Sequence, residues 1–169
     1  MPIPWKAVEE FDLRGYPVCK TAYAELKSYY QKCLVEIPRD SPVVKQSQRL
    51  YDFLVLKRQV HLIYDSICNL DLIHPLLKSK LNYCLQINLF SMKNLYDIYN
   101  GQESLSLERD YEILSKHFYR CEFCESKKGY ICPKCKDPVK IFPFELRDTH
   151  GCKNCRKLFH RKCLFYREC

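Results

Sequence analysis

The segments CEFCESKKGYICPKCK (residues 121–136) and CKNCRKLFHRKC (residues 152–163) decide the fold of this chain. Two cysteines separated by two residues form a tight turn that directs both sulfur atoms at one ion, and two such pairs complete a tetrahedron with Zn–S distances of about 2.3 Å. Eight of the 12 cysteines lie in this tail. We therefore predict a zinc-built C-terminal module with these ligands: Cys121, Cys124, Cys132, Cys135, Cys152, Cys155, His160, Cys163 and Cys169.

Disulfide bonds are the alternative role for so many cysteines, because small secreted scaffolds also carry them in even numbers. The sequence favours zinc. The first residues, Met1 to Lys6, contain no basic segment followed by an apolar run. No stretch approaches the roughly 18 apolar residues that a membrane span requires. We expect a reducing, cytoplasmic environment.

The spacing leaves the pairing of the ligands open. In cross-braced fingers adjacent pairs bind different ions, so we expect Cys152 and Cys155 to share an ion with Cys169. His160 and Cys163 would then join an upstream pair, either 121/124 or 132/135. These ligands overfill two tetrahedral sites and underfill three, so we expect two or three Zn²⁺ ions. His117 and His150 are candidate additional ligands, and we expect a further cysteine beyond Cys169 to complete its knuckle.

The composition predicts a mainly α fold. The chain has 169 residues, 47% of them hydrophobic, and its four glycines disfavour an all-β architecture built on tight turns. Residues 1–119 are expected to form a helical body and residues 120–169 a cross-braced zinc-finger module with short β-strands, packed as a single unit. Apolar periodicity and capping residues predict helices over residues 17–35, over about 25 residues from Pro42, and over residues 76–85, 91–99 and 104–117.

The net charge of +8 lies on the tail, because residues 1–115 carry 14 basic and 14 acidic side chains and residues 116–169 carry 14 and 6. Eight zinc-bound thiolates and two Zn²⁺ ions would halve that charge, so we expect no nucleic-acid partner. Cys33, Cys68 and Cys84 fall within apolar stretches and are expected to be small buried side chains. No nucleophile elbow, phosphate loop or metalloprotease pair is present, so we expect neither an enzyme nor a small-molecule substrate.

The chain resembles the Rubicon-homology domain, the C-terminal module of the Rubicon, Pacer and pleckstrin-homology-and-RUN adaptor family. The resemblance covers nearly the whole chain. Its most specific part is the combination of Gly129-Tyr-Ile-Cys132 with Ile141-Phe-Pro-Phe-Glu145, which is far rarer than zinc-ligand spacing alone. Further matches are His117, the Cys-x2-Cys pairs, residues 11–19 and residues 95–101.

The resemblance implies a non-enzymatic effector of the GTP-bound late-endosomal Rab GTPase (Rab seven). Such a domain acts in autophagy and endosome–lysosome trafficking, on the cytoplasmic side of late endosomes, lysosomes and autophagosomes. Side chains around the last knuckle are candidate partner contacts: Arg156, Lys157, Phe159, Arg161, Lys162, Phe165 and Tyr166. The aromatic members alternatively pack over the zinc core, and the basic members alternatively form a solvated face.

Two other functions fit the finger spacing. A cross-braced finger is compatible with a RING-type ubiquitin ligase, although a ligase leaves the long helical body unexplained. The basic residues Arg156 to Lys162 are compatible with a finger that binds anionic lipid, since each basic residue near a membrane contributes roughly 1 kcal/mol. We expect this lipid attraction to be weak and secondary.

Overall fold

A computed structural model of the chain describes residue 2, residues 4–68 and residues 86–164. The chain forms two compact units. Unit 1 comprises residues 1–57 and 85–109, and unit 2 comprises residues 58–84 and 110–169. Two long helices, α4 (Gln48–Ser66) and α8 (Gln102–Arg120), contribute residues to both units. The sequence boundary at residues 119 and 120, and the packing as a single unit, stay predictions.

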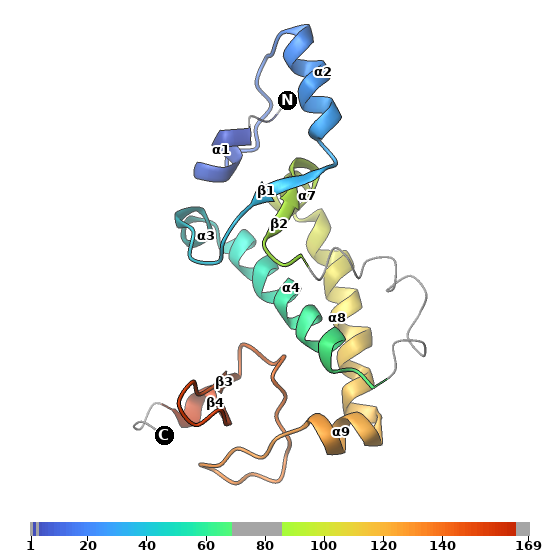
Figure 1. The fold of residues 1–169 in the computed structure, drawn as a ribbon, viewed down its shortest axis with the longest axis vertical. Coiled ribbons are helices and arrows are strands. Elements are labelled where there is room, and N and C mark those ends of the chain that lie inside the picture. Colours follow the sequence, from blue (N-terminus) through green and yellow to red (C-terminus); the bar gives the residue numbers. More distant parts are fainter. Residues whose placement is uncertain (1, 3, 69–85, 165–169) are drawn as a thin grey trace. The chain divides into compact units, whose positions relative to one another are not determined.

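Unit 1 surrounds a small antiparallel pair of strands, β1 (Cys33–Glu36) and β2 (Leu89–Ser91). Figure 1 shows β1 in blue beside β2 in green. Helices α1 (Pro4–Glu9), α2 (Lys20–Tyr29), α3 (Pro42–Gln46) and α7 (Met92–Tyr99) complete it, together with the first part of α4 and of α8. α1 contacts α3 and α7.

The helix expected over residues 17–35 is shorter than predicted. It spans Lys20–Tyr29, and the chain then enters β1, in which Val35 pairs with Phe90 of β2. α2 buries none of its side chains, so no apolar contact extends it. Pairing with a strand more than 50 residues away supplies backbone hydrogen bonds that a local helical pattern does not reveal.

The long helix expected from Pro42 is divided at Ser47. Ser41 is the N-cap of α3, with Pro42 in its first turn as predicted, but Ser47 adopts an extended backbone conformation. The Ser47 hydroxyl accepts a hydrogen bond from the Leu50 N–H at 3.3 Å. Ser47 therefore ends α3 and caps α4, as serine commonly does at a helix start. The helix expected over residues 76–85 lies outside the described residues.

The helix expected over residues 91–99 is confirmed. Ser91 caps α7 through a capping box with Asn94, and Gly101 follows the helix at φ 77°. This left-handed conformation is the one that favours glycine after a helix. α8 begins at Gln102, slightly before the predicted start, and continues to Arg120.

Lys57, on α4, is a fully buried lysine in unit 1. Its ammonium group donates to the carbonyl oxygens of Gln86 at 2.9 Å and Leu89 at 3.3 Å, and it lies 4.5 Å from the ring centroid of Phe90. A buried cation is tolerated only with such partners. Lys57 thereby holds the strand β2 against α4.

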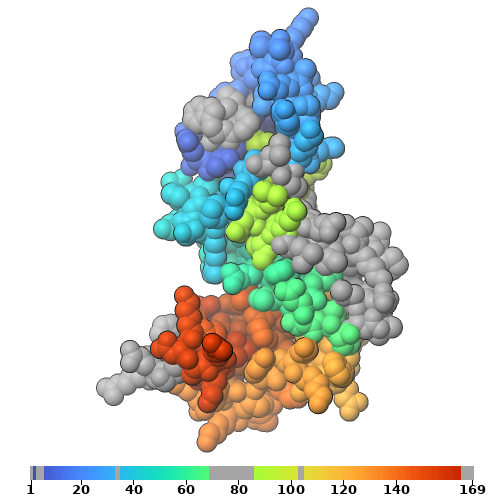
Figure 2. Space-filling view, viewed as in Figure 1, coloured from blue at the N-terminus to red at the C-terminus, as the bar shows by residue number. Residues whose placement is uncertain are grey.

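Unit 2 contains the finger. Helix α9 (Glu122–Lys128) follows α8, and strands β3 (Thr149–Gly151) and β4 (Leu158–His160) form an antiparallel pair closed by the 3-10 turn η2 (Arg161–Cys163). Figure 2 shows the red segment that contains these strands packed against the orange segment before it. The expected mainly helical fold with a Cys/His finger containing short strands is confirmed.

Helix α9 was not predicted. Its first turn carries Glu122 and Glu125 and its last turn carries Lys127 and Lys128. Acidic residues near the N-terminus and basic residues near the C-terminus complement the helix dipole. This distribution of charge could have predicted the helix. The Cys-x2-Cys spacing of the same residues indicated a knuckle turn instead. Among the described residues, no helix has the length and apolar character needed to cross a bilayer.

An aromatic cluster fixes the finger to the end of α8 within unit 2. Phe118 contacts Phe142 and Phe144, with ring centroids 5.7 and 5.0 Å apart. The Tyr119 hydroxyl donates to one carboxylate oxygen of Glu145, and the other oxygen accepts from the Phe142 N–H at 2.7 Å. The Ile141-Phe-Pro-Phe-Glu145 motif therefore has a structural role: its two phenylalanines and its glutamate attach the finger to the helix.

Candidate metal centres

Two groups of four side chains bring their ligand atoms to within 4.8 Å of one another. Centre 1 consists of Cys68, His117, Cys121 and Cys124, and centre 2 consists of Cys132, Cys135, His160 and Cys163. Both belong to unit 2. Each presents three sulfur atoms and one imidazole nitrogen.

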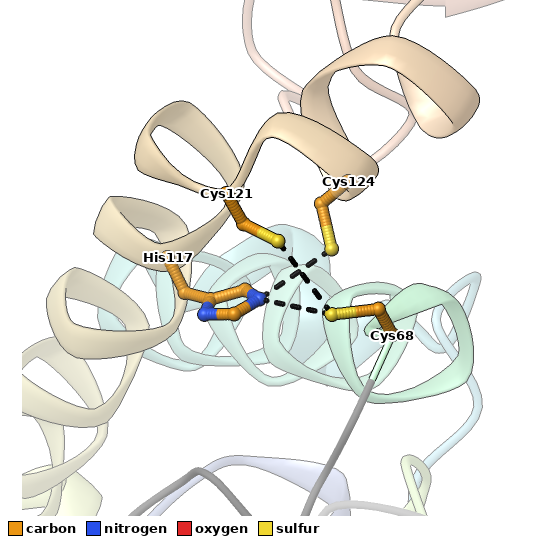
Figure 3. A group of neighbouring side chains, drawn as sticks. All are labelled: Cys68, His117, Cys121 and Cys124. Atoms are coloured by element: carbon orange, nitrogen blue, oxygen red, sulfur yellow. Dashed lines mark hydrogen bonds between the residues drawn. The ribbon is translucent and has the colours of Figure 1, made fainter.

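Centre 1 joins three helical segments (Figure 3). Cys68 follows the end of α4, His117 lies on the last turn of α8, and Cys121 and Cys124 lie at the start of α9. His117 Nε2 is 3.4 Å from the sulfur of Cys68 and 3.4 Å from that of Cys124. The two sulfur atoms of Cys68 and Cys121 are 3.7 Å apart.

These separations fit one tetrahedral ion. With Zn–S bonds of about 2.3 Å and Zn–N bonds of about 2.0 Å, a tetrahedron has S–S edges of about 3.8 Å and S–N edges of about 3.5 Å. A disulfide would instead require an S–S distance of about 2 Å. The described cysteines of both centres are free thiols. The donor set and its spacing therefore suit a closed tetrahedral metal site.

Centre 2 crosses the finger. Cys132 and Cys135 come from the turn between Tyr130 and Ile141, which pair in an isolated β-bridge, and His160 and Cys163 come from the end of β4 and from η2. His160 Nδ1 is 3.3 Å from the Cys135 sulfur and 3.9 Å from the Cys163 sulfur. The pair that joins His160 and Cys163 is thus 132/135, a choice that the spacing left open. This pairing straddles Cys152 and Cys155, as a cross-braced finger requires.

The environment of Cys132 favours its thiolate. Burial acts to raise its pKa, but hydrogen bonds from the backbone at Cys135, His160 and Lys134 outweigh burial and lower the pKa to about 6. Cys163 of the same centre has a raised pKa because of burial and the neighbouring sulfur atoms.

Centre 1 likewise contains one cysteine with a lowered pKa and one with a raised pKa. The Cys124 N–H and further hydrogen bonds lower the pKa of Cys121, whereas burial raises the pKa of Cys124 to about 12. One thiolate disfavours a second beside it, and a divalent cation among them removes this conflict. The sulfur atoms of both centres are therefore arranged for a cation rather than for independent ionisation.

Cys152 and Cys155 form a third knuckle. The Cys152 carbonyl accepts from the Arg156 N–H at 2.9 Å, just as the Cys132 carbonyl accepts from the Lys136 N–H at 2.9 Å. Arg156 and Lys136 also share a left-handed conformation, with φ of 57° and 54°. The two turns are thus built alike. Within residues 86–164 no third ligand joins this pair, and Cys169 lies outside the described residues.

Cys68 is the ligand candidate that sequence reasoning missed. We expected a small buried side chain, which is wrong because Cys68 is exposed and its sulfur lies in centre 1. No cysteine lies at knuckle spacing from it, so the sequence offered no direct signal. His117 is brought into centre 1, whereas His150 is in neither group.

The candidate partner contacts differ in their exposure to solvent. Phe159 is only 3% exposed and packs in the finger core with Cys132, Ile141 and Leu158, so the expectation of an exposed contact is wrong for it. Arg156, Lys157, Arg161 and Lys162 are exposed. Phe165 and Tyr166 lie outside the described residues.

Comparison with known proteins identifies the family. The model of the Rubicon Homology Domain matches residues 1–169. Pleckstrin homology domain-containing family M member 3 is 28% identical over 167 residues in Homo sapiens and 26% identical over 167 residues in Xenopus laevis, covering 95% of this chain and 22% of each relative. The human protein associated with UVRAG as autophagy enhancer is 33% identical over 84 residues, covering 50% of this chain and 12% of the relative. The chain thus spans about a fifth of the length of the first two relatives.

Proposed function

The chain belongs to the Rubicon homology domain family, and we propose that it is a zinc-stabilised protein-interaction domain rather than an enzyme. The observation that carries this proposal is the pair of closed Cys3His centres. Each offers four protein ligands to one ion, whereas catalytic zinc sites keep a position for water or substrate. Thiolate and imidazole ligands in tetrahedral geometry are typical of zinc.

Zinc in these centres would act on the fold. Centre 1 would join the end of α4 to the junction of α8 and α9, and centre 2 would join the two ends of the finger. Structural zinc sites contribute about 10 to 16 kcal/mol of apparent binding free energy in peptide models. A surface held rigid in this way loses little conformational entropy on binding a partner.

The proposed partner is the GTP-bound late-endosomal Rab GTPase, on the basis of family resemblance. Switch regions of small GTPases are ordered by the γ-phosphate, so an effector with a rigid surface distinguishes the two nucleotide states. One relative is named as an autophagy enhancer, which supports a role in autophagy. The chain would then be cytoplasmic and reach late endosomes, lysosomes and autophagosomes through the Rab.

Nucleotide-dependent binding tests this function. The chain should bind the Rab loaded with a GTP analogue and not the GDP form, and equal titration curves for both forms would refute the partner. Chelation of the metal should abolish binding, because loss of the ligated ion unfolds a structural site. An autoubiquitination assay with a panel of conjugating enzymes tests the ligase alternative, for which we expect no product.

A further inference from the structure

A cavity of about 430 Å³ lies on the finger next to centre 2. Its walls are Arg147, Asp148, His160, Arg161 and Lys162. Ligand pockets in proteins commonly measure about 300 to 1,000 Å³, so this one accommodates a small polar molecule. Three of its five lining side chains are basic and one is acidic, which favours an anionic ligand.

Arg161 is held in place by the backbone. Its Nε donates to the Arg147 carbonyl at 3.1 Å, and its Nη2 donates to the carbonyls of Leu146 at 2.7 Å and Thr149 at 3.4 Å. These bonds orient the guanidinium without neutralising it, because its partners are carbonyl dipoles. Nη1 takes no part in them and stays able to donate to a ligand. A cation positioned before binding loses little entropy when an anion arrives.

Three further residues that line the same cavity carry two donor groups and one acceptor group. Since His160 directs Nδ1 at the sulfur atoms of Cys135 and Cys163, its Nε2 lies on the opposite edge of the ring. Lys162 is exposed and supplies a flexible ammonium group. Asp148 supplies a carboxylate that repels a bare anion but accepts hydrogen bonds from hydroxyl groups. The cavity thus offers donors for phosphate and an acceptor for a hydroxyl.

We propose that this cavity binds the phosphorylated inositol headgroup of a membrane lipid. Phosphate oxygens would accept from Arg161 and Lys162, and a ring hydroxyl would donate to Asp148. Three thiolates and one divalent ion leave centre 2 with one net negative charge, so nearby metal does not attract the anion. Binding would therefore depend on these directed hydrogen bonds rather than on overall charge. A phosphopeptide has no ring hydroxyls for Asp148 and is the less suitable ligand.

Calorimetric titration of the zinc-loaded chain with soluble inositol trisphosphate tests the cavity. We expect one site, and we expect Lys162→Gln to weaken binding about tenfold, since one charge-assisted hydrogen bond contributes about 1.5 kcal/mol or more. Lys153→Gln is the matched control: it removes the same charge from an exposed finger position outside the cavity, and affinity should be unchanged. Asp148→Asn should weaken inositol trisphosphate but not inorganic phosphate. Zinc content and melting temperature should match the wild type in all three variants.

The lipid itself is tested with two vesicles of equal surface charge. Phosphatidylcholine vesicles containing phosphatidylinositol phosphate should bind the chain more tightly than those containing phosphatidylserine, and Lys162→Gln should remove the difference. Equal binding to both vesicles, or equal losses in Lys153→Gln and Lys162→Gln, would overturn the proposal in favour of diffuse electrostatic attraction. Inorganic phosphate or a phosphoserine peptide binding as tightly as inositol trisphosphate would also overturn it. These outcomes are independent of Rab binding, which is measured without lipid.

Discussion

The sulfur of Cys68 lies 3.4 Å from Nε2 of His117, although 49 residues separate them in sequence. Cys68 follows the end of α4, His117 lies on α8, and Cys121 and Cys124 complete the group at the start of α9. Centre 1 is therefore not a local knuckle. Its ligands connect the helical part of unit 2 to the start of the finger.

Replacement of Cys68 tests whether centre 1 makes this connection. Cys68→Ser should lower the zinc content by one ion per chain and lower the melting temperature, because a site with three remaining ligands binds metal more weakly. Elemental mass spectrometry and thermal unfolding measure the two effects. Cys19→Ser is the matched control, since Cys19 is also an exposed free thiol but belongs to neither centre. Equal zinc contents in wild type and Cys68→Ser would show that Cys68 is not a ligand.

The finger was the part of the fold best predicted from sequence, because ligand spacing is a local property. The three Cys-x2-Cys knuckles and the closing turn follow from short-range pattern, whereas the choice between 121/124 and 132/135 as partners of His160 depends on the tertiary path. Cys68 depends on that path entirely. Centre 1 forms only because the C-terminal end of α4 lies close to the start of α9. The residues around Cys68 carry no sequence pattern that predicts this proximity.

The helical part was predicted where capping chemistry is local. Ser91 and Gly101 mark both ends of α7, and the structure agrees with them. The apolar spacing of residues 33–35 predicts the end of a helix, but these residues belong to β1, which pairs with Leu89–Ser91. The two strands are far apart in the sequence, so a local pattern that covers only one of them cannot predict that they pair.

Gly129 is a position where the backbone approaches its neighbours closely. A Cβ atom built there would lie 2.7 Å from the Glu125 carbonyl oxygen and 2.7 Å from Cδ of Lys140. Gly129→Ala should therefore destabilise the chain by about 1 to 3 kcal/mol, as overpacked sites do. Chemical denaturation measures this change. Gly15→Ala serves as the control, because a Cβ there would meet nothing within 4 Å. Similar stabilities for the two variants would contradict the close packing at Gly129.

Tyr119 should keep its proton at a pH at which an ordinary tyrosine, with a pKa of about 10, has lost it. Burial raises the pKa of Tyr119, and the hydrogen bond to the Glu145 carboxylate raises it further. The folded state then holds this proton more tightly than the unfolded state. The resulting stability is complete below the unfolded pKa and is lost as the pH rises towards the folded value.

Stability measured across the alkaline range tests this linkage. The wild type should lose more stability above the ordinary tyrosine pKa than Tyr119→Phe does. Near neutral pH, Tyr119→Phe should cost about 1 kcal/mol or less, because the side chain is half-exposed and solvent screens the bond. Tyr23→Phe is the control, an exposed tyrosine on α2. Parallel curves for the wild type and Tyr119→Phe would rule out the proposed link to Glu145.

X-ray absorption at the zinc edge, performed on the chain purified without added reductant, tests the central claim most directly. Centres 1 and 2 predict bound zinc whose first shell is dominated by sulfur at about 2.3 Å, with imidazole nitrogen at about 2.0 Å. A folded chain that contains no zinc, or whose cysteines of centres 1 and 2 are joined in disulfides, would contradict the metal-built finger and the interaction domain that depends on it.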